Sequence, residues 1–133
     1  MSKKKLERKE LWKNDPDEHD FPAAFSYLSL ICGTEAAQSI VKSLNESAKE
    51  TRKAKDLLRA SGLSPLPRSN FHVSSDLKKI AKGIPLSPVL LVRGDIGGHL
   101  KLTIADGYHR ICASYLVNED EDIPCRIAEP KFT

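Results

Sequence analysis

The chain has 133 residues, of which 40% are hydrophobic and 29% charged, with a formal net charge of +3, and this length suits one domain or one domain plus an appendage. No apolar run approaches the roughly 18 residues of a membrane-spanning helix, and the basic amino terminus is not followed by the apolar segment of a signal peptide. The three cysteines lack a paired spacing, which favours a reducing compartment, so we expect a cytoplasmic protein with no membrane partner.

The first part of the chain predicts two amphipathic helices. Residues 21–32 form the first, with Asp20 as its N-cap and Gly33 at its end, and residues 34–44 form the second. Their apolar faces contain Phe21, Phe25, Leu28, Ala37, Ile40, Val41 and Leu44. We expect these side chains to bury against the rest of the chain or across the interface of a homodimer.

Charged residues surround these helices. The acidic stretch 15–20 is interpreted as a solvated turn before the first helix, and no metal site is predicted there. Residues 45–61 continue as a polar, basic helix, which is either a solvated or partner-binding face or a contact for nucleic acid. Two prolines within 63–70 break the helical pattern. We therefore divide the chain into an N-terminal helical extension, residues 1–62, and a core, residues 63–133.

The core alternates between helical and strand patterns. The expected elements are a short helix over 74–83 capped by Ser74 or Ser75, an apolar strand over 87–93, a glycine-rich hairpin loop over 94–98, a strand over 100–106, a helix over 108–117 and a strand over 123–129. This order predicts an α+β fold in which a small mixed β-sheet carries the helices.

The joint at Asp106 and Gly107, where a strand passes directly into a helix, gathers polar side chains. On its own, the dipeptide is interpreted as a helix cap and a turn. The first turn of a helix favours acidic residues, however, and this one carries His109 and Arg110, which favours an anion nearby. A glycine, free backbone N–H groups, an imidazole and a guanidinium at a helix start together form a phosphate-binding arrangement.

The carboxylate of Asp106 indicates phosphoryl chemistry rather than passive phosphate binding. A carboxylate beside a phosphate becomes useful if a divalent cation bridges the two, or if it acts as a base toward a hydroxyl. Asp106 is therefore the candidate catalytic residue. Arg110 is expected to be the main phosphate anchor, because it remains protonated and presents two parallel donors, and His109 a weaker one. Because Arg110 is interpreted as a surface residue, we expect its loss to leave the stability of the fold almost unchanged.

The segments "SSDLKKIAKGIPLSPVLLVRG", "LKLTIADGYHRICASY" and "IPCRI" give the core a family resemblance. Over roughly residues 63–128 they resemble the ParB N-terminal and sulfiredoxin-like superfamily, also labelled the ParB-like nuclease domain. Its members use the corresponding turn to bind nucleotide phosphates. The resemblance implies a phosphate or nucleotide site formed by Gly107, Tyr108, His109 and Arg110, with Arg68, Ser69 and His72 as second-tier candidates on a segment that crosses near the nucleotide.

The branches of this superfamily imply different activities. Sulfiredoxin carries Gly-Cys-His-Arg at this turn, and its nucleophilic cysteine aligns with Tyr108, so the resemblance does not imply a sulfiredoxin. ParB partition proteins carry Gly-x-x-Arg and continue into a DNA-binding domain, whereas this sequence ends soon after its last expected strand. The dipeptide Asp106–Gly107 followed by Arg110 resembles most the free-serine-kinase branch, which implies ATP or another nucleotide with Mg²⁺.

Two classes of function follow. The leading expectation is a nucleotide- or phosphate-binding ParB/sulfiredoxin-like domain whose activity is phosphoryl transfer or nucleotide hydrolysis. The alternative is a non-enzymatic, DNA-associated or regulatory module that retains the ParB-like fold. A turn that binds nothing and serves only as cap and connection is the third interpretation.

Overall fold

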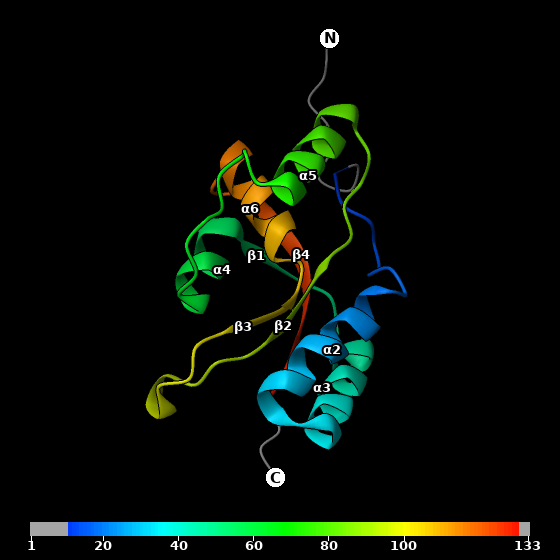
Figure 1. Ribbon diagram of the computed structural model, residues 1–133, viewed down its shortest axis with the longest axis vertical. Coiled ribbons are helices and arrows are strands. Elements are labelled where there is room, and N and C mark those ends of the chain that lie inside the picture. Colours follow the sequence, from blue (N-terminus) through cyan, green and yellow to red (C-terminus); the bar gives the residue numbers. More distant parts are fainter. Residues whose placement is uncertain (1–10, 131–133) are drawn as a thin grey trace.

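The protein is an α+β domain, as the sequence predicts. The structure, a computed structural model, describes residues 11–130, so the first ten residues of the predicted extension lie outside the described part of the chain (Figure 1). The elements are α2 (Asp20–Cys32), α3 (Thr34–Glu46), β1 (Glu50–Lys53), α4 (Ala54–Ser61), α5 (Phe71–Lys82), β2 (Val89–Val92), a 3₁₀ turn (Ile96–Gly98), β3 (Thr103–Asp106), α6 (Tyr108–Val117) and β4 (Asp122–Ala128). No helix in the described part of the chain is both long and apolar enough to cross a membrane.

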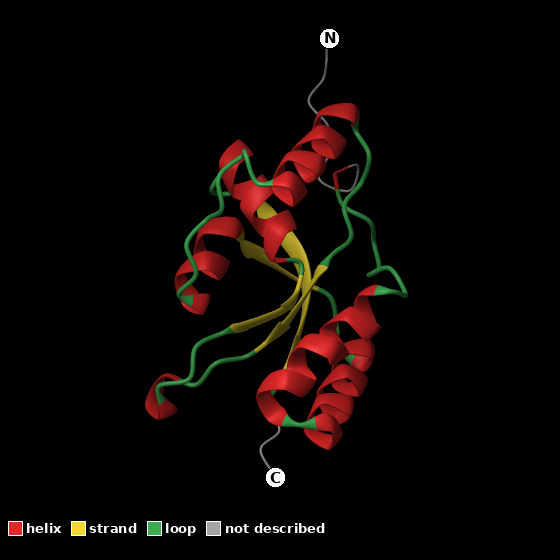
Figure 2. Ribbon diagram, viewed as in Figure 1, coloured by secondary structure: helices red, strands yellow, loops and turns green. Residues whose placement is uncertain are grey.

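The sheet has four strands in the order β1-β4-β2-β3. β2 pairs in parallel with β4 and antiparallel with β3, and β1 pairs antiparallel with β4. Helices cover both faces of this sheet (Figure 2). β2 is central, and its four residues are all buried, which confirms that a continuous apolar run marks a strand covered on both sides.

The two N-terminal helices bury their apolar faces against the sheet. α2 contacts β3, and α3 contacts β4. One hydrophobic cluster joins Ala24, Leu28, Ala37, Ile40 and Leu44 of these helices to Leu90, Val92, Ala105 and Ala128 of the strands. Of the two predicted alternatives, burial against the rest of the chain is therefore the one observed, with Phe21, Phe25 and Val41 only partly buried.

The predicted continuous helix over 45–61 is wrong. α3 ends at Glu46, and residues 50–53 form the strand β1 before α4 begins at Ala54. The charged sequence "ETRK" pairs along the edge of β4, where backbone hydrogen bonds outweigh a weak helical preference. Edge strands tolerate charge on their open side, which prevents unwanted pairing with other chains. The N-terminal part is consequently not all-helical.

The helix before β2 begins earlier than predicted. α5 starts at Phe71, and its cap is Asn70 rather than Ser74 or Ser75. The Asn70 side-chain oxygen accepts the backbone N–H of His72 at 3.0 Å and that of the following residue at 3.1 Å. This extra turn adds His72 to the face of α5 that lies near the Asp106–Gly107 joint.

Candidate functional site

The strand-to-helix joint lies where the sequence predicts it. β3 ends at Asp106, and α6 begins at Tyr108 after Gly107, whose φ is +112°. A side chain at Gly107 would contact the methyl group of Val89 and place its Cβ 2.8 Å from the Val89 Cβ, so the turn requires glycine. No side chain among the described residues caps α6, so the interpretation of Asp106 as its cap is wrong.

Arg110 makes three contacts inside the protein. Its Nη2 donates to Asp106 Oδ2 at 2.5 Å. Its Nη1 donates to the backbone carbonyl of Ser87 at 2.9 Å and lies 3.3 Å from Asp20 Oδ2. The side chain is only 14% exposed. The guanidinium thus connects the β3–α6 turn to the segment just before β2 and to the start of α2.

Asp20 belongs to this network, contrary to its predicted role as a helix cap. α2 has no side-chain cap, and the Asp20 side chain is 6% exposed. The Ser87 hydroxyl donates to Asp20 Oδ2, and the Asp17 backbone N–H donates to that hydroxyl at 3.0 Å. The expected solvated turn over 15–20 is therefore wrong at its last residue, because the mostly buried guanidinium draws in a second carboxylate.

The carboxyl group of Asp106 is easier to protonate in this environment than it would be in water. Burial raises the pKa of Asp106, and the neighbouring Asp20 raises it further. Arg110 acts in the opposite direction through its charge and its hydrogen bond. A carboxyl group whose pKa is raised accepts a proton more readily, which is the property of a general base.

Asp106 lies in a cleft of about 400 Å³ between α5, α6 and the segments that precede α2 and β2. Charged and polar residues line it: Lys13, Asp17, His19, Asp20, His72, Ser75, Asp76, Lys79, Ser87, Asp106, His109 and Arg110, with Gly107, Ile84, Pro85 and Leu86. Three cationic side chains therefore face four carboxylates, before any charge on the histidines. Lys13 and Asp17 neutralise each other at 2.8 Å, and this contact lowers the pKa of Asp17.

Two histidines lie together at the mouth of the cleft. The ring centroids of His72 and His109 are 4.7 Å apart. Burial lowers the pKa of His109, and the nearby His72 lowers it further, so His109 is mainly neutral at pH 7. Burial raises the pKa of Asp76 on α5, and the charge of Lys79 opposes this rise.

The structure brings some predicted residues together and leaves others apart. Asp106, Gly107, His109, Arg110 and His72 all line the cleft. Tyr108 does not, because its hydroxyl donates to the carbonyl of Ser64. Arg68 and Ser69 are exposed in the loop before α5 and are not part of the cleft lining.

Several residues that line the cleft were not predicted as site residues, among them Asp20, Asp76, Lys79 and Ser87. The sequence pattern could have indicated two of these residues, Asp76 and Lys79. His72, Asp76 and Lys79 follow each other at helical spacings of four and three, so they share one face of α5. The late predicted start of this helix left His72 outside it and concealed the pattern.

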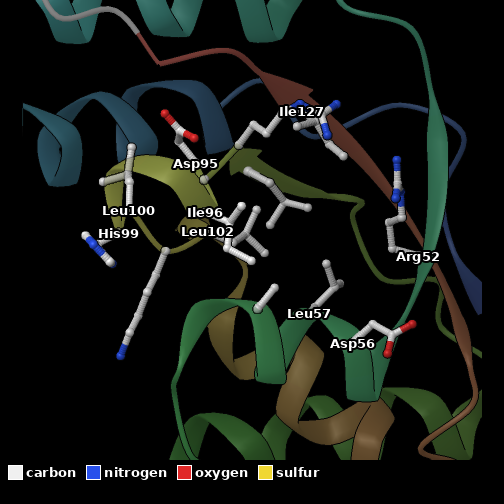
Figure 3. A pocket seen from close by; sticks show the side chains of 14 residues that line it. Arg52, Asp56, Leu57, Asp95, Ile96, His99, Leu100, Leu102 and Ile127 are labelled. Atoms are coloured by element: carbon white, nitrogen blue, oxygen red, sulfur yellow. The ribbon is translucent and has the colours of Figure 1, made fainter.

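A larger hollow of about 640 Å³ lies elsewhere, between α4 and the β2–β3 hairpin (Figure 3). Its apolar lining includes Leu57, Leu91, Ile96, Leu100, Leu102 and Ile127. Its arginines are already paired: Arg52 Nη2 lies 2.6 Å from Glu50 Oε1. Arg93 Nε lies 2.8 Å from Glu129 Oε2. The hollow is mainly apolar, and the residues of the β3–α6 turn do not line it.

The segment before α2 contains one group of possible metal ligands. One donor atom each from Asp17, His19 and Asp20 lies within 4.8 Å of the other two. The Asp20 carboxylate already accepts from Ser87 and Arg110, which explains its position without a metal. We assign no metal site to this group.

Comparisons of the chain with protein-family models, with curated proteins and with solved structures yield no match. The chemistry of the cleft is therefore the basis for assigning a function.

Proposed function

We propose that this protein binds a phosphorylated ligand of the nucleotide class at the β3–α6 turn. The observation that carries the proposal is the N-terminus of α6, which has no side-chain cap among the described residues and opens through Gly107 onto a cleft with Lys79 and His109. Unpaired N–H groups and the positive end of the helix dipole favour a phosphate there. Gly107 lets the phosphate approach the backbone closely.

Within this proposal, Arg110 positions the site rather than anchoring the phosphate. Its two terminal nitrogens are engaged by Asp106, Asp20 and the carbonyl of Ser87. The phosphate is held instead by the first N–H groups of α6 and by Lys79, whose side chain is exposed at the cleft. Arg110 then fixes the direction of the Asp106 carboxylate.

The ligand binds together with Mg²⁺. Because four carboxylates outnumber three cations in the cleft, a polyphosphate would meet net negative charge without a metal. Mg²⁺ in nucleotide sites commonly uses one or two carboxylates together with substrate phosphates. Asp76 is the residue that fits this role, because Lys13 holds Asp17, Ser87 and Arg110 hold Asp20, and Arg110 holds Asp106.

Phosphoryl transfer is the activity that this arrangement serves. Asp106 takes the proton of an acceptor hydroxyl or water as its oxygen bonds to the terminal phosphorus. The bond from that phosphorus to the bridging oxygen breaks, and the nucleoside diphosphate leaves. The resemblance to the ParB N-terminal and sulfiredoxin-like superfamily, nearest the free-serine-kinase branch, agrees with this proposal.

The alternative of a DNA-associated module finds less support. The basic residues over 52–59, which would contact DNA, are each near a carboxylate. Lys53 lies 3.5 Å from Asp122, and Lys55 lies 2.8 Å from Asp120. Arg59 lies 3.4 Å from Asp56. Salt-sensitive binding of duplex DNA that Mg²⁺-nucleotide does not affect would favour the alternative.

The proposal also covers the cellular compartment and the oligomeric state of the protein. The three cysteines are free thiols, two of them buried, which supports the cytoplasm as the compartment. Tyr27, Leu30 and Ile31 are exposed on α2, and this apolar strip would be the contact surface of a homodimer.

Lys79→Ala is expected to weaken binding of Mg²⁺-tripolyphosphate by about ten- to a hundredfold, because a charge-assisted contact is worth about 1.5–3 kcal/mol. Isothermal titration calorimetry measures this directly. Lys78→Ala is the matched control, since Lys78 is exposed on the same helix but does not line the cleft. Equal affinities for the two variants would place the phosphate elsewhere.

Asp106→Asn is expected to reduce Mg²⁺-ATP turnover by about a hundredfold or more, because the amide cannot accept a proton. Its oxygen still accepts from Arg110, and binding of the nucleotide is expected to persist. A coupled assay of phosphate release, beside calorimetric affinity, separates the two effects. Turnover equal to that of the wild type would remove Asp106 from the catalytic role.

A further inference from the structure

We infer that a row of aromatic rings at the start of α5 is the platform for the base of the nucleotide, an inference that rests on the proposed function. The ring row consists of Phe71, His72 and His109. It begins on the surface with Phe71, which is 79% exposed, and ends in the cleft with His109 beside Gly107. The ring row thus extends from the proposed phosphate position to the exposed ring of Phe71.

The rings lie in contact with one another. The Phe71 and His72 centroids are 5.4 Å apart with the planes at 79°, an edge-on arrangement. The His72 and His109 centroids are 4.7 Å apart with the planes tilted by 43°. These separations are in the range of favourable aromatic pairs. The row is therefore continuous from Phe71 to the turn that would bind phosphate.

Local structure fixes the backbone that carries the first two rings. The Asn70 side chain accepts the N–H groups of His72 and Val73, which fixes the first turn of α5. Val73 is fully buried in the core that also contains Leu57 and Ile111. The backbone that carries Phe71 and His72 is thus held in place, so a base that stacks there would order side chains but not the backbone.

The ring row distinguishes between classes of phosphorylated ligand. A phosphosugar or a phosphorylated amino acid without a ring has no planar group to place on it. A nucleotide has one at the end opposite its phosphates, and every base has a π-face that stacks on aromatic side chains. His109 is mainly neutral at pH 7, because burial lowers its pKa, so its ring is available to stack. The ligand is accordingly a nucleotide, and purines bind more tightly than pyrimidines because they offer a larger face.

The test compares Mg²⁺-ATP with Mg²⁺-tripolyphosphate, which has the same chain of phosphates and no base. In the wild type, calorimetry is expected to show about tenfold tighter binding of ATP. Phe71→Leu is expected to remove most of this advantage and leave the affinity for tripolyphosphate unchanged, while Phe71→Trp keeps it. Tyr27→Leu, which removes an exposed aromatic ring from α2, is expected to change neither affinity.

The other possible outcomes of this test would contradict the platform alone or the proposed function with it. Equal affinities of the wild type for ATP and tripolyphosphate would overturn the platform and leave the phosphate site standing. The same would follow if Phe71→Leu left the advantage of ATP intact or weakened both ligands equally. If neither ligand bound the wild type, the proposed function would fail, and the platform with it. Circular dichroism of each variant confirms that the fold is retained.

Discussion

Arg110→Ala is expected to destabilise the fold by about 3–5 kcal/mol at neutral pH, because it leaves buried carboxylates without their cation. Both Asp106 and Asp20 contact the guanidinium, and their side chains are 19% and 6% exposed. Urea unfolding followed by circular dichroism measures the loss. The sequence alone predicts almost no loss, since it places Arg110 on the surface, so this measurement separates a positioning residue from an exposed anchor.

Arg59→Ala is the control for this substitution. Arg59 pairs with Asp56 at 3.4 Å on the surface of α4, and its side chain is 82% exposed. Loss of such a pair is expected to cost less than about 1 kcal/mol. If Arg110→Ala cost no more than Arg59→Ala, the buried network would contribute nothing measurable to stability.

The effect of Arg110→Ala is also expected to depend on pH. Burial already holds the pKa of Asp106 above its usual value, and removal of the cation raises it further. A carboxyl group whose pKa is higher in the folded state stabilises the fold at low pH and loses that contribution as pH rises through this pKa. The variant should therefore lose less stability at pH 5 than at pH 7.5, which unfolding curves at the two values compare.

Local sequence patterns were sufficient for the centre of the fold. The uninterrupted apolar run at 89–92 predicts a strand buried on both faces, and that strand is β2. The alternating residues before Asp106, followed by glycine, predict a strand that passes into a helix. Both patterns depend on neighbours along the chain, so tertiary contacts had no reason to alter them.

The edge of the sheet was not predictable in this way. The stretch 50–53 contains two basic residues, an acidic residue and a threonine, and its pattern does not alternate. It becomes a strand because β4 offers it an open edge, at positions about seventy residues later in the chain. A pairing partner so far away leaves no trace in a short window of sequence.

The network around Arg110 escaped prediction for the same reason. Asp20 lies 90 residues before Arg110 in the chain, and its position before a helix makes a cap the natural interpretation. The sequence shows a candidate cation at Arg110 but cannot show which carboxylates reach it. The candidate site was thus predicted at the turn itself, where the residues are consecutive, and was missed where other elements contribute to it.

Gly107→Ala is expected to cost about 2–5 kcal/mol, for two separable reasons. A non-glycine residue in a left-handed conformation costs about 1–2 kcal/mol, and overpacking of a tight core adds about 1–3 kcal/mol. The second part arises because the new Cβ would lie 2.8 Å from the Cβ of Val89, a fully buried residue of β2 that cannot move aside. Overpacking at this position would displace the turn, and this displacement is expected to abolish binding of Mg²⁺-tripolyphosphate.

Gly62→Ala separates strain from overpacking. Gly62 has a similar left-handed conformation, with φ +72° and ψ 14° beside φ +112° and ψ 14° at Gly107. Its new Cβ would meet only the flexible end of the Lys101 side chain, so strain alone remains and the expected cost is about 1–2 kcal/mol. Val89→Ala removes the γ-methyl group that the new Cβ would contact most closely, although it keeps the Cβ of residue 89. The double variant should therefore lose less stability than the two single variants added together. Additive losses from urea unfolding would show that β2 does not constrain the turn.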